Sequence, residues 1–136
     1  MISVYLSSQL GNMMFQYAAI KTIAQTKGVD FRYFRIDNTS YINSTDAKYG
    51  CELNTIFPIP KEEQIFEIPA NLKPYQEQPP HLRNYPNYPK DVQNSISDNM
   101  LVRGFFITPE IFQHNISTIR EWFSLPEPAV KKASNL

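Results

Sequence analysis

Residues 2–28 read ISVYLSSQLGNMMFQYAAIKTIAQTKG, and this stretch combines a strand pattern with a helix pattern. Over residues 2–6, Ile, Val and Leu alternate with Ser and Tyr, which is the period of a strand with one buried face. Residues 12–27 contain neither glycine nor proline, and Gly28 then fits the position that follows the last turn of a helix. The stretch therefore predicts a strand, a short connection and a helix.

The side chains of the predicted helix change character along its length. Its first half is apolar on almost every side, and a polar stripe opens only at Lys21, Thr22, Gln25 and Thr26. We expect the N-terminal end of this helix to enter the core and its C-terminal end to emerge into solvent.

Two further strands are predicted after this helix. Residues 30–36 read DFRYFRI and residues 100–106 read MLVRGFF, which are both strand patterns. A strand, a helix and another strand in succession are typical of a βαβ unit with parallel strands. The expected fold class is therefore α/β, with a parallel, Rossmann-like sheet in a single domain over residues 1–136.

The segment after the third predicted strand indicates two helical stretches. Residues 108–109, Thr-Pro, fit the N-cap and the first position of a helix. Residues 116–123 then place apolar side chains on one helical face. We expect Phe105, Phe106 and Phe112 to lie in the core rather than to form a platform for a sugar ring.

Residues 69–90 hold six of the eleven prolines, with Tyr75, Tyr85 and Tyr88 between them. Proline at this density interrupts helices and central strands, so we expect a Pro/Tyr-rich loop extended across the surface. Exposed tyrosine rings in such a loop could stack on an acceptor sugar. A polyproline ligand for another protein is the alternative, although the segment has no repeated P-x-x-P spacing.

The composition excludes several classes of protein. Thirteen basic and thirteen acidic residues give a formal net charge of zero, so nothing draws the chain to nucleic acid or to an anionic membrane. Cys51 is the only cysteine, which excludes an internal disulfide and favours a reducing cytoplasm. We find no signal peptide and no membrane-spanning run, and attachment at the membrane periphery stays open. With His81 and His114 as the only histidines, no metal site and no cofactor are predicted.

The connection between the first strand and the helix is the best candidate for a binding site. The first N–H groups of a helix lack partners and lie at the positive end of its dipole, so they attract anions. Gly11 would let the backbone approach a ligand, Asn12 could hydrogen-bond it, and Gln16 lies one turn further on the same face. Alternatively, Asn12 only caps the helix and Gln16 only satisfies a neighbouring carbonyl. The sequence contains neither a dinucleotide fingerprint nor a P-loop.

The same connection resembles the start of the α-1,2-fucosyltransferases, the family 11 glycosyltransferases. Residues 10–18, LGNMMFQYA, match eight of the nine letters in the family segment L-G-N-Q-M-F-Q-Y-A. Residues 101–112, LVRGFFITPEIF, are similar to the later family segment L-x-G-Y-F-Q-S-x-x-Y-F, and residues 119–123, IREWF, are similar to I-R-x-x-F. The resemblance implies a GT-B-like, two-domain fold and inverting, metal-independent transfer of fucose from GDP-fucose to a galactoside glycan. It assigns Gly11 and Asn12, followed by Gln16, to substrate binding.

Three departures from the family pattern limit what the resemblance implies. Ser8-Gln9 stand where the family has Gly-Gly or Gly-Arg, and Met13 stands where it has Gln. The 136 residues also lack the basic segment H-V-R-R-G-D-Y, which in the family is associated with the diphosphate of the nucleotide sugar. Arg103 and Arg120 do not match that pair of arginines, so no catalytic residue is assigned.

We therefore expect this chain to be the N-terminal part of a fucosyltransferase-like protein and to be inactive by itself. A truncated, non-catalytic glycan-binding or remnant protein is the alternative. In either case, a sheet without its further strands would expose an edge, so self-association is also expected.

Overall fold

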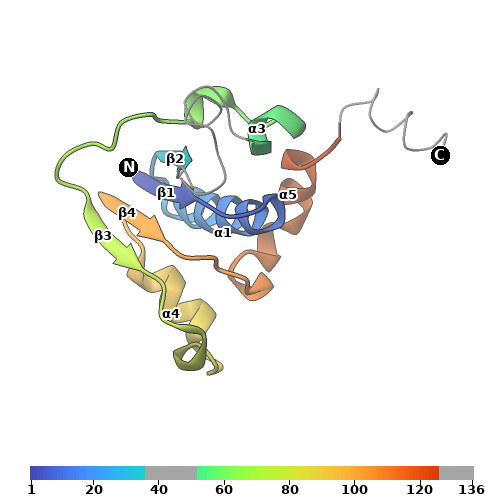
Figure 1. Ribbon diagram of the computed structural model, residues 1–136. Coiled ribbons are helices and arrows are strands. Elements are labelled where there is room, and N and C mark those ends of the chain that lie inside the picture. Colours follow the sequence, from blue (N-terminus) through green and yellow to red (C-terminus); the bar gives the residue numbers. More distant parts are fainter. Residues whose placement is uncertain (36–51, 126–136) are drawn as a thin grey trace.

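The computed structural model describes residues 1–35 and 52–125, which form an α/β structure around a four-stranded parallel sheet (Figure 1). The strands have the order β2-β1-β4-β3, and every neighbouring pair is parallel. Their bounds are Ile2–Leu6 for β1, Phe31–Arg35 for β2, Lys73–Gln76 for β3 and Met100–Arg103 for β4. The predicted parallel sheet is thus confirmed for the described residues.

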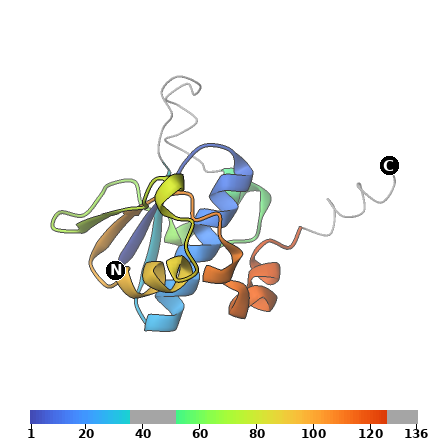
Figure 2. The ribbon, with the colours of Figure 1, turned by 90° about the horizontal axis from the view of Figure 1, so that it is seen from below.

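The helix α1, Leu10–Lys27, connects β1 to β2 and lies along one face of the sheet (Figures 1 and 2). It begins two residues before the predicted start, and it ends as expected because Gly28 takes a left-handed φ of 67°. Tyr17 is fully buried at the centre of α1, and its ring meets the rings of Phe31 and Tyr33 on β2 edge-to-face. These contacts fix α1 against β1 and β2.

The expected emergence of α1 into solvent is confirmed at Gln25 and Thr26, which are exposed, but is wrong for Lys21 and Thr22. Lys21 and Thr22, predicted at the solvated surface, are only 8% and 1% exposed. Lys21 is buried because its ammonium group lies 3.0 Å from a carboxylate oxygen of Glu63 and 4.6 Å from the ring centre of Trp122. Segments far away in sequence therefore cover Lys21 and Thr22, the first half of the polar stripe, which a local pattern does not reveal.

The helices α3, Glu52–Ile56, and α5, Ile116–Trp122, pack at the same side of the molecule as α1 (Figure 1). The ring centres of Phe57, just after α3, and Phe123, just after α5, lie 5.1 Å apart. Ile119 is the buried residue of α5, whereas Ile116 is 39% exposed. Only part of the apolar helical face predicted over residues 116–123 therefore packs into the core.

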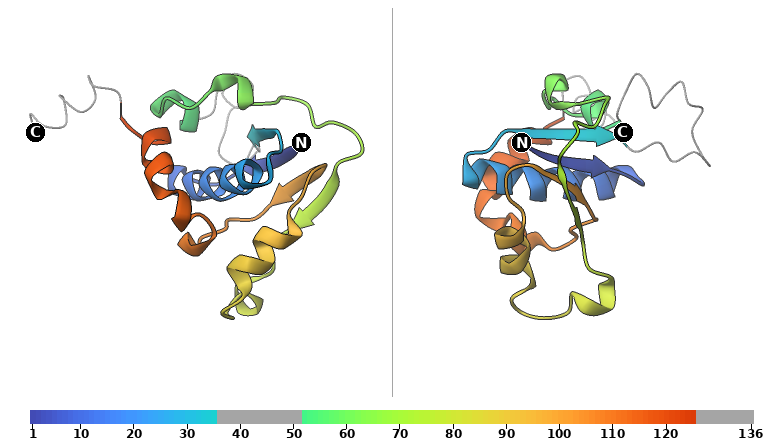
Figure 3. Two further views of the ribbon diagram at one scale, coloured as in Figure 1. Left: turned by 180° about the vertical axis from the view of Figure 1, so that it is seen from behind. Right: turned by 90° about the vertical axis from the view of Figure 1, so that its left-hand side faces the viewer.

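The Pro/Tyr-rich segment is more ordered than a surface loop. Residues 69–90 contain the edge strand β3, and the helix α4, Tyr88–Ser95, starts at their end (Figure 3). Lys73 donates its backbone N–H to the carbonyl of Asn99, just before β4, and Glu77 donates to that of Arg103 at the end of β4. Pro74 therefore lies at a position whose N–H would face outward. Proline fits there because no ladder bond needs its missing N–H. Tyr88 is buried, contrary to the expectation of an exposed ring.

The third predicted strand is shorter than expected, and its continuation turns away from the sheet. β4 ends at Arg103, and the helix predicted after Thr108 is two 3₁₀ turns, Pro109–Ile111 and Gln113–Asn115. Phe106 and Phe112 are core residues as predicted, but Phe105 is 40% exposed, which corrects its assignment to the core.

The two edges of the sheet differ in how they are covered. Ile65 donates its N–H to the carbonyl of Tyr33 at 2.8 Å, so the segment that follows the 3₁₀ turn Lys61–Glu63 covers part of the β2 edge. The β3 edge has no such partner strand among the described residues, but Pro74 removes a donor from it. Self-association stays a prediction.

No helix in the described part of the chain has the length and apolar character needed to cross a membrane.

Candidate functional site

A hollow of about 510 Å³ opens at the carboxyl ends of β1, β3 and β4. In open parallel sheets, ligands characteristically bind at this end of the strands. Its walls combine four residues with a carboxamide or a hydroxyl group, two arginines, one carboxylate, two aromatic rings and two prolines. The lining residues are Tyr5, Ser7, Gln76, Glu77, Gln78, Pro79, Pro80, Arg83, Arg103, Gly104 and Phe105.

The carboxylate of Glu77 organises one wall of this hollow. One oxygen accepts hydrogen bonds from Arg83 at 2.8 Å and from the backbone N–H of Phe105 at 3.0 Å. The other accepts from the N–H of Phe106 at 3.1 Å and from the hydroxyl of Tyr88. Four donors, one of them the charged Arg83, thus satisfy a carboxylate that is only 4% exposed, and they fix the loop after β4.

The loop after β4 requires a glycine at position 104. A Cβ at Gly104 would lie 2.4 Å from the Cβ of Glu77 and 2.9 Å from the ring of Phe106, and the φ of Gly104 is 154°. Phe106 itself is fully buried with a φ of 53°, an uncommon conformation for a bulky residue. The bonds to Glu77 hold this strained backbone in place.

Gln16 joins the loop after β1 to the loop after β4. Its side-chain oxygen accepts the N–H of Ser7 at 2.9 Å, and its NH₂ group donates to the Ser7 hydroxyl at 3.0 Å and to the Gly104 carbonyl at 2.9 Å. Both amide hydrogens of Gln16 are therefore used within the protein, and the side chain is 1% exposed. Gln16 lies behind the wall of the hollow and positions Ser7 and Gly104, which line it.

The other two predicted binding residues lie beside the hollow and do not line it. Gly11 is exposed on the first turn of α1, and a Cβ there would meet nothing within 4 Å. Asn12 is half-buried and donates to the Ser8 hydroxyl at 3.0 Å. The N-cap of α1 is Gln9, without a side-chain bond, so the expectation that Asn12 caps the helix is wrong. The fold thus gives no steric reason for a glycine at position 11.

Ser8, in the turn between β1 and α1, takes a backbone conformation that favours glycine. Its φ is 68°, a left-handed conformation that costs a non-glycine residue roughly 1 kcal/mol. The Asn12 bond to the Ser8 hydroxyl offsets part of that cost. The turn from β1 into α1 therefore keeps a shape that suits glycine although this chain has serine.

Arg103, the last residue of β4, presents its guanidinium group to the hollow. The central carbon of the guanidinium lies 4.2 Å from the ring centre of Tyr5, which is stacking distance. Tyr5 is in turn held edge-to-face against Phe34. Arg103 is exposed, and no carboxylate of the described residues forms an ion pair with it. The sequence singled out Arg103 only as an arginine near a motif.

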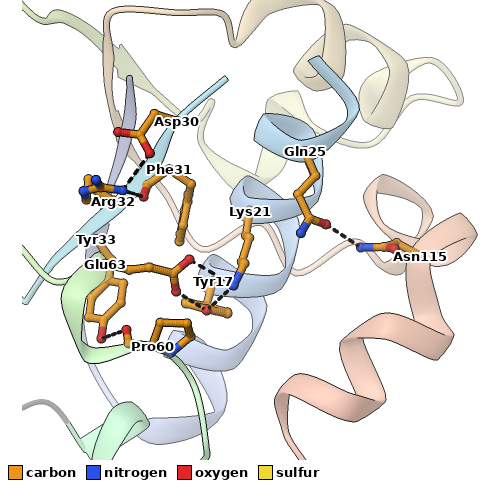
Figure 4. A network of polar contacts seen from close by, with 10 residues as sticks. All are labelled: Tyr17, Lys21, Gln25, Asp30, Phe31, Arg32, Tyr33, Pro60, Glu63 and Asn115. Carbon is orange, nitrogen blue, oxygen red and sulfur yellow. Dashed lines mark hydrogen bonds and ion pairs between the residues drawn. The ribbon is translucent and has the colours of Figure 1, made fainter. Parts of the chain in front are cut away.

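A second polar cluster involves α1 and includes no residue that lines the hollow (Figure 4). The hydroxyl of Tyr17 donates to Glu63 at 2.5 Å and accepts from Lys21 at 2.8 Å. Burial raises the pKa of Tyr17, and the hydrogen bond and the charge of Glu63 raise it further. Because Tyr17 is fully buried, this cluster joins α1 to the segment around Glu63 and has no access to a ligand.

Sequence reasoning missed Glu77 and Gly104 as organisers of the site. The only signals were that Glu77 is the sole acid within residues 69–90 and that Gly104 is one of four glycines in the chain. Over residues 1–35 and 52–125, no three His, Cys, Asp or Glu side chains come together as a possible metal site. Cys51 lies outside the described residues.

Comparisons of the chain with protein-family models, with curated proteins and with solved structures found no match in any of the three.

Proposed function

We propose that this chain is the N-terminal part of a GDP-fucose-dependent, GT-B-like fucosyltransferase and that its hollow binds the acceptor glycan. The observation that carries the proposal is the position of the hollow. It lies at the carboxyl ends of three parallel strands, and Gln16 from the fucosyltransferase-like segment builds its wall. The resemblance in residues 10–18 supplies the reaction class, and the hollow supplies a place for the acceptor.

The lining of the hollow suits a carbohydrate. Gln76 and Gln78 offer exposed carboxamides that can donate to and accept from sugar hydroxyl groups. The half-exposed ring of Phe105 and the prolines Pro79 and Pro80 offer flat apolar surface for the C–H face of a sugar ring. Such a mixture of few polar groups and apolar walls is typical of small-molecule sites.

The catalytic groups are not assigned to this chain. A general base for the acceptor hydroxyl must be free to take a proton, but four donors already occupy the Glu77 carboxylate. Departure of GDP also needs positive charge at the β-phosphate, and the 136 residues lack the basic segment that serves this purpose in the family. The chain would orient the acceptor, and the exposed Gly11 turn would face the donor.

Calorimetry and a transfer assay test this proposal. The chain is titrated separately with lactose, GDP and GDP-fucose, and then incubated with lactose and GDP-fucose together. We expect lactose and, more weakly, GDP-fucose to bind, with no fucose transferred. The second candidate is a glycan-binding protein, which the missing basic segment favours. If lactose binds but neither GDP nor GDP-fucose does, this second candidate is supported instead. Absence of lactose binding, or robust transfer by these 136 residues, would refute the proposal.

A further inference from the structure

We propose that the hollow selects an acidic glycan, whose carboxylate or sulfate group binds Arg103. This inference rests on the proposed function, because it specifies the acceptor class for the same hollow. It starts from the electrostatics of the wall, where Arg83, Arg103 and Glu77 are the charged residues.

The charges in the wall leave one cation without a partner. Arg83 and Glu77 neutralise each other across 2.8 Å, and the N–H groups of Phe105 and Phe106 also donate to the Glu77 carboxylate. Arg103 has no acidic partner among the described residues. The hollow therefore carries a net positive charge in a chain whose formal net charge is zero.

The guanidinium of Arg103 is held in place before any ligand arrives. Its central carbon lies 4.2 Å from the ring centre of Tyr5, and Tyr5 is buried and in contact with Phe34. A guanidinium offers a planar fork of N–H donors that matches the two oxygens of a carboxylate or a sulfate. Because the contact with Tyr5 already restricts the side chain, less side-chain entropy is lost on binding.

A single acidic group fits this wall better than the diphosphate of a nucleotide sugar. A diphosphate carries several negative charges and is usually held by several cations or by free backbone N–H groups. Here the two backbone N–H groups at the carboxyl end of β4 are already occupied by Glu77, and only Arg103 remains unpaired. One free cation beside carboxamides and an exposed aromatic ring corresponds to one acid on a sugar.

Calorimetry with matched probes tests the inference. The full chain is titrated with lactose, with 3′-sialyllactose, with lactose 3′-sulfate and with GDP. The variants are Arg103→Gln and Arg120→Gln; the second makes the same change of charge at an exposed arginine of α5 outside the hollow. Thermal unfolding of each variant checks that its fold is retained.

We expect both acidic probes to bind at least about tenfold more tightly than lactose, the range expected for a charge-assisted hydrogen bond. Arg103→Gln should abolish this preference, whereas Arg120→Gln should leave the preference intact. Raising the salt concentration should reduce the preference, because ions screen an accessible charge.

Three results would overturn the inference. Equal affinity for lactose and for the acidic probes would refute acid selection and leave the proposed acceptor site standing. Binding of GDP that depends on Arg103, without a preference for acidic glycans, would assign the arginine to the donor. Failure of every glycan to bind would refute the inference together with the proposed function.

Discussion

The substitution Gln16→Met tests whether the side-chain amide of Gln16 stabilises the folded site or is needed only to bind a ligand. The two side chains have similar length, so the substitution removes polar contacts with little change of volume. In the folded chain, Gln16 makes three hydrogen bonds of 2.9 to 3.0 Å that connect Ser7 to Gly104. We therefore expect Gln16→Met to destabilise the chain before any ligand is added.

The size of the effect follows from those contacts. Each hydrogen bond contributes about 1 kcal/mol net, so three contribute about 3 kcal/mol. The loss could exceed that sum, because the Ser7 N–H and the Gly104 carbonyl would be left without a partner next to a side chain that is 1% exposed. Domains typically have a free energy of unfolding of about 5–15 kcal/mol, so the variant should still fold.

Urea unfolding monitored by circular dichroism measures this loss. The control is Gln25→Met, which makes the same substitution on the same helix at an exposed position with one weak contact of 3.5 Å to Asn115. It should change the free energy of unfolding by less than about 0.5 kcal/mol. If Gln16→Met costs no more than this control, the assignment of Gln16 to positioning the two loops is refuted.

Three further predictions concern stability alone. Gly11→Ala should raise the free energy of unfolding by up to about 1 kcal/mol, because alanine favours helix and its Cβ meets nothing within 4 Å; a loss in urea unfolding would contradict this. Gly104→Ala should lower it by about 3 kcal/mol or more, since a Cβ would lie 2.4 Å from that of Glu77; an unchanged midpoint would show that the loop relaxes freely. The free energy of unfolding should also fall above about pH 10. In the unfolded chain Tyr17 has the ordinary pKa of 10.0 and loses its proton there, whereas in the folded chain its pKa is raised and it keeps the proton. Tyr17→Phe should reduce that slope by about 1.4 kcal/mol per pH unit, and an unaltered slope in unfolding at alkaline pH would exclude this linkage.

The parts of the fold that follow local rules could be predicted from the sequence. Alternation identified β1, and Gly28 marked the end of α1, because both depend on residues that are adjacent in the chain. The burial of Lys21 was not predictable in this way, since it depends on Glu63 and Trp122 from distant segments. The strand β3 was missed because proline density argues against strands in general, while an edge position tolerates Pro74.

The candidate site shows the same division. The sequence offered two roles for Gln16, contact with a ligand and a hydrogen bond to a neighbouring carbonyl. The bond to the Gly104 carbonyl agrees with the second role, but only the fold shows that Ser7 and Gly104 are the partners. The role of Glu77 arises only when β3 and β4 lie side by side, which brings its carboxylate to the N–H group of Phe105. Gly11 and Asn12 lie outside the lining of the hollow, so their contact with a ligand stays a prediction.

The most direct test of the proposed acceptor site is a titration of the ¹⁵N-labelled chain with lactose, followed by NMR through the backbone amide shifts. We expect the largest changes in amide shift to cluster around the hollow at the carboxyl ends of the strands, at Ser7, Gln76, Gly104 and Phe105. Absence of saturable changes, or a cluster at the other end of α1 around Thr26 and Lys27, would contradict it.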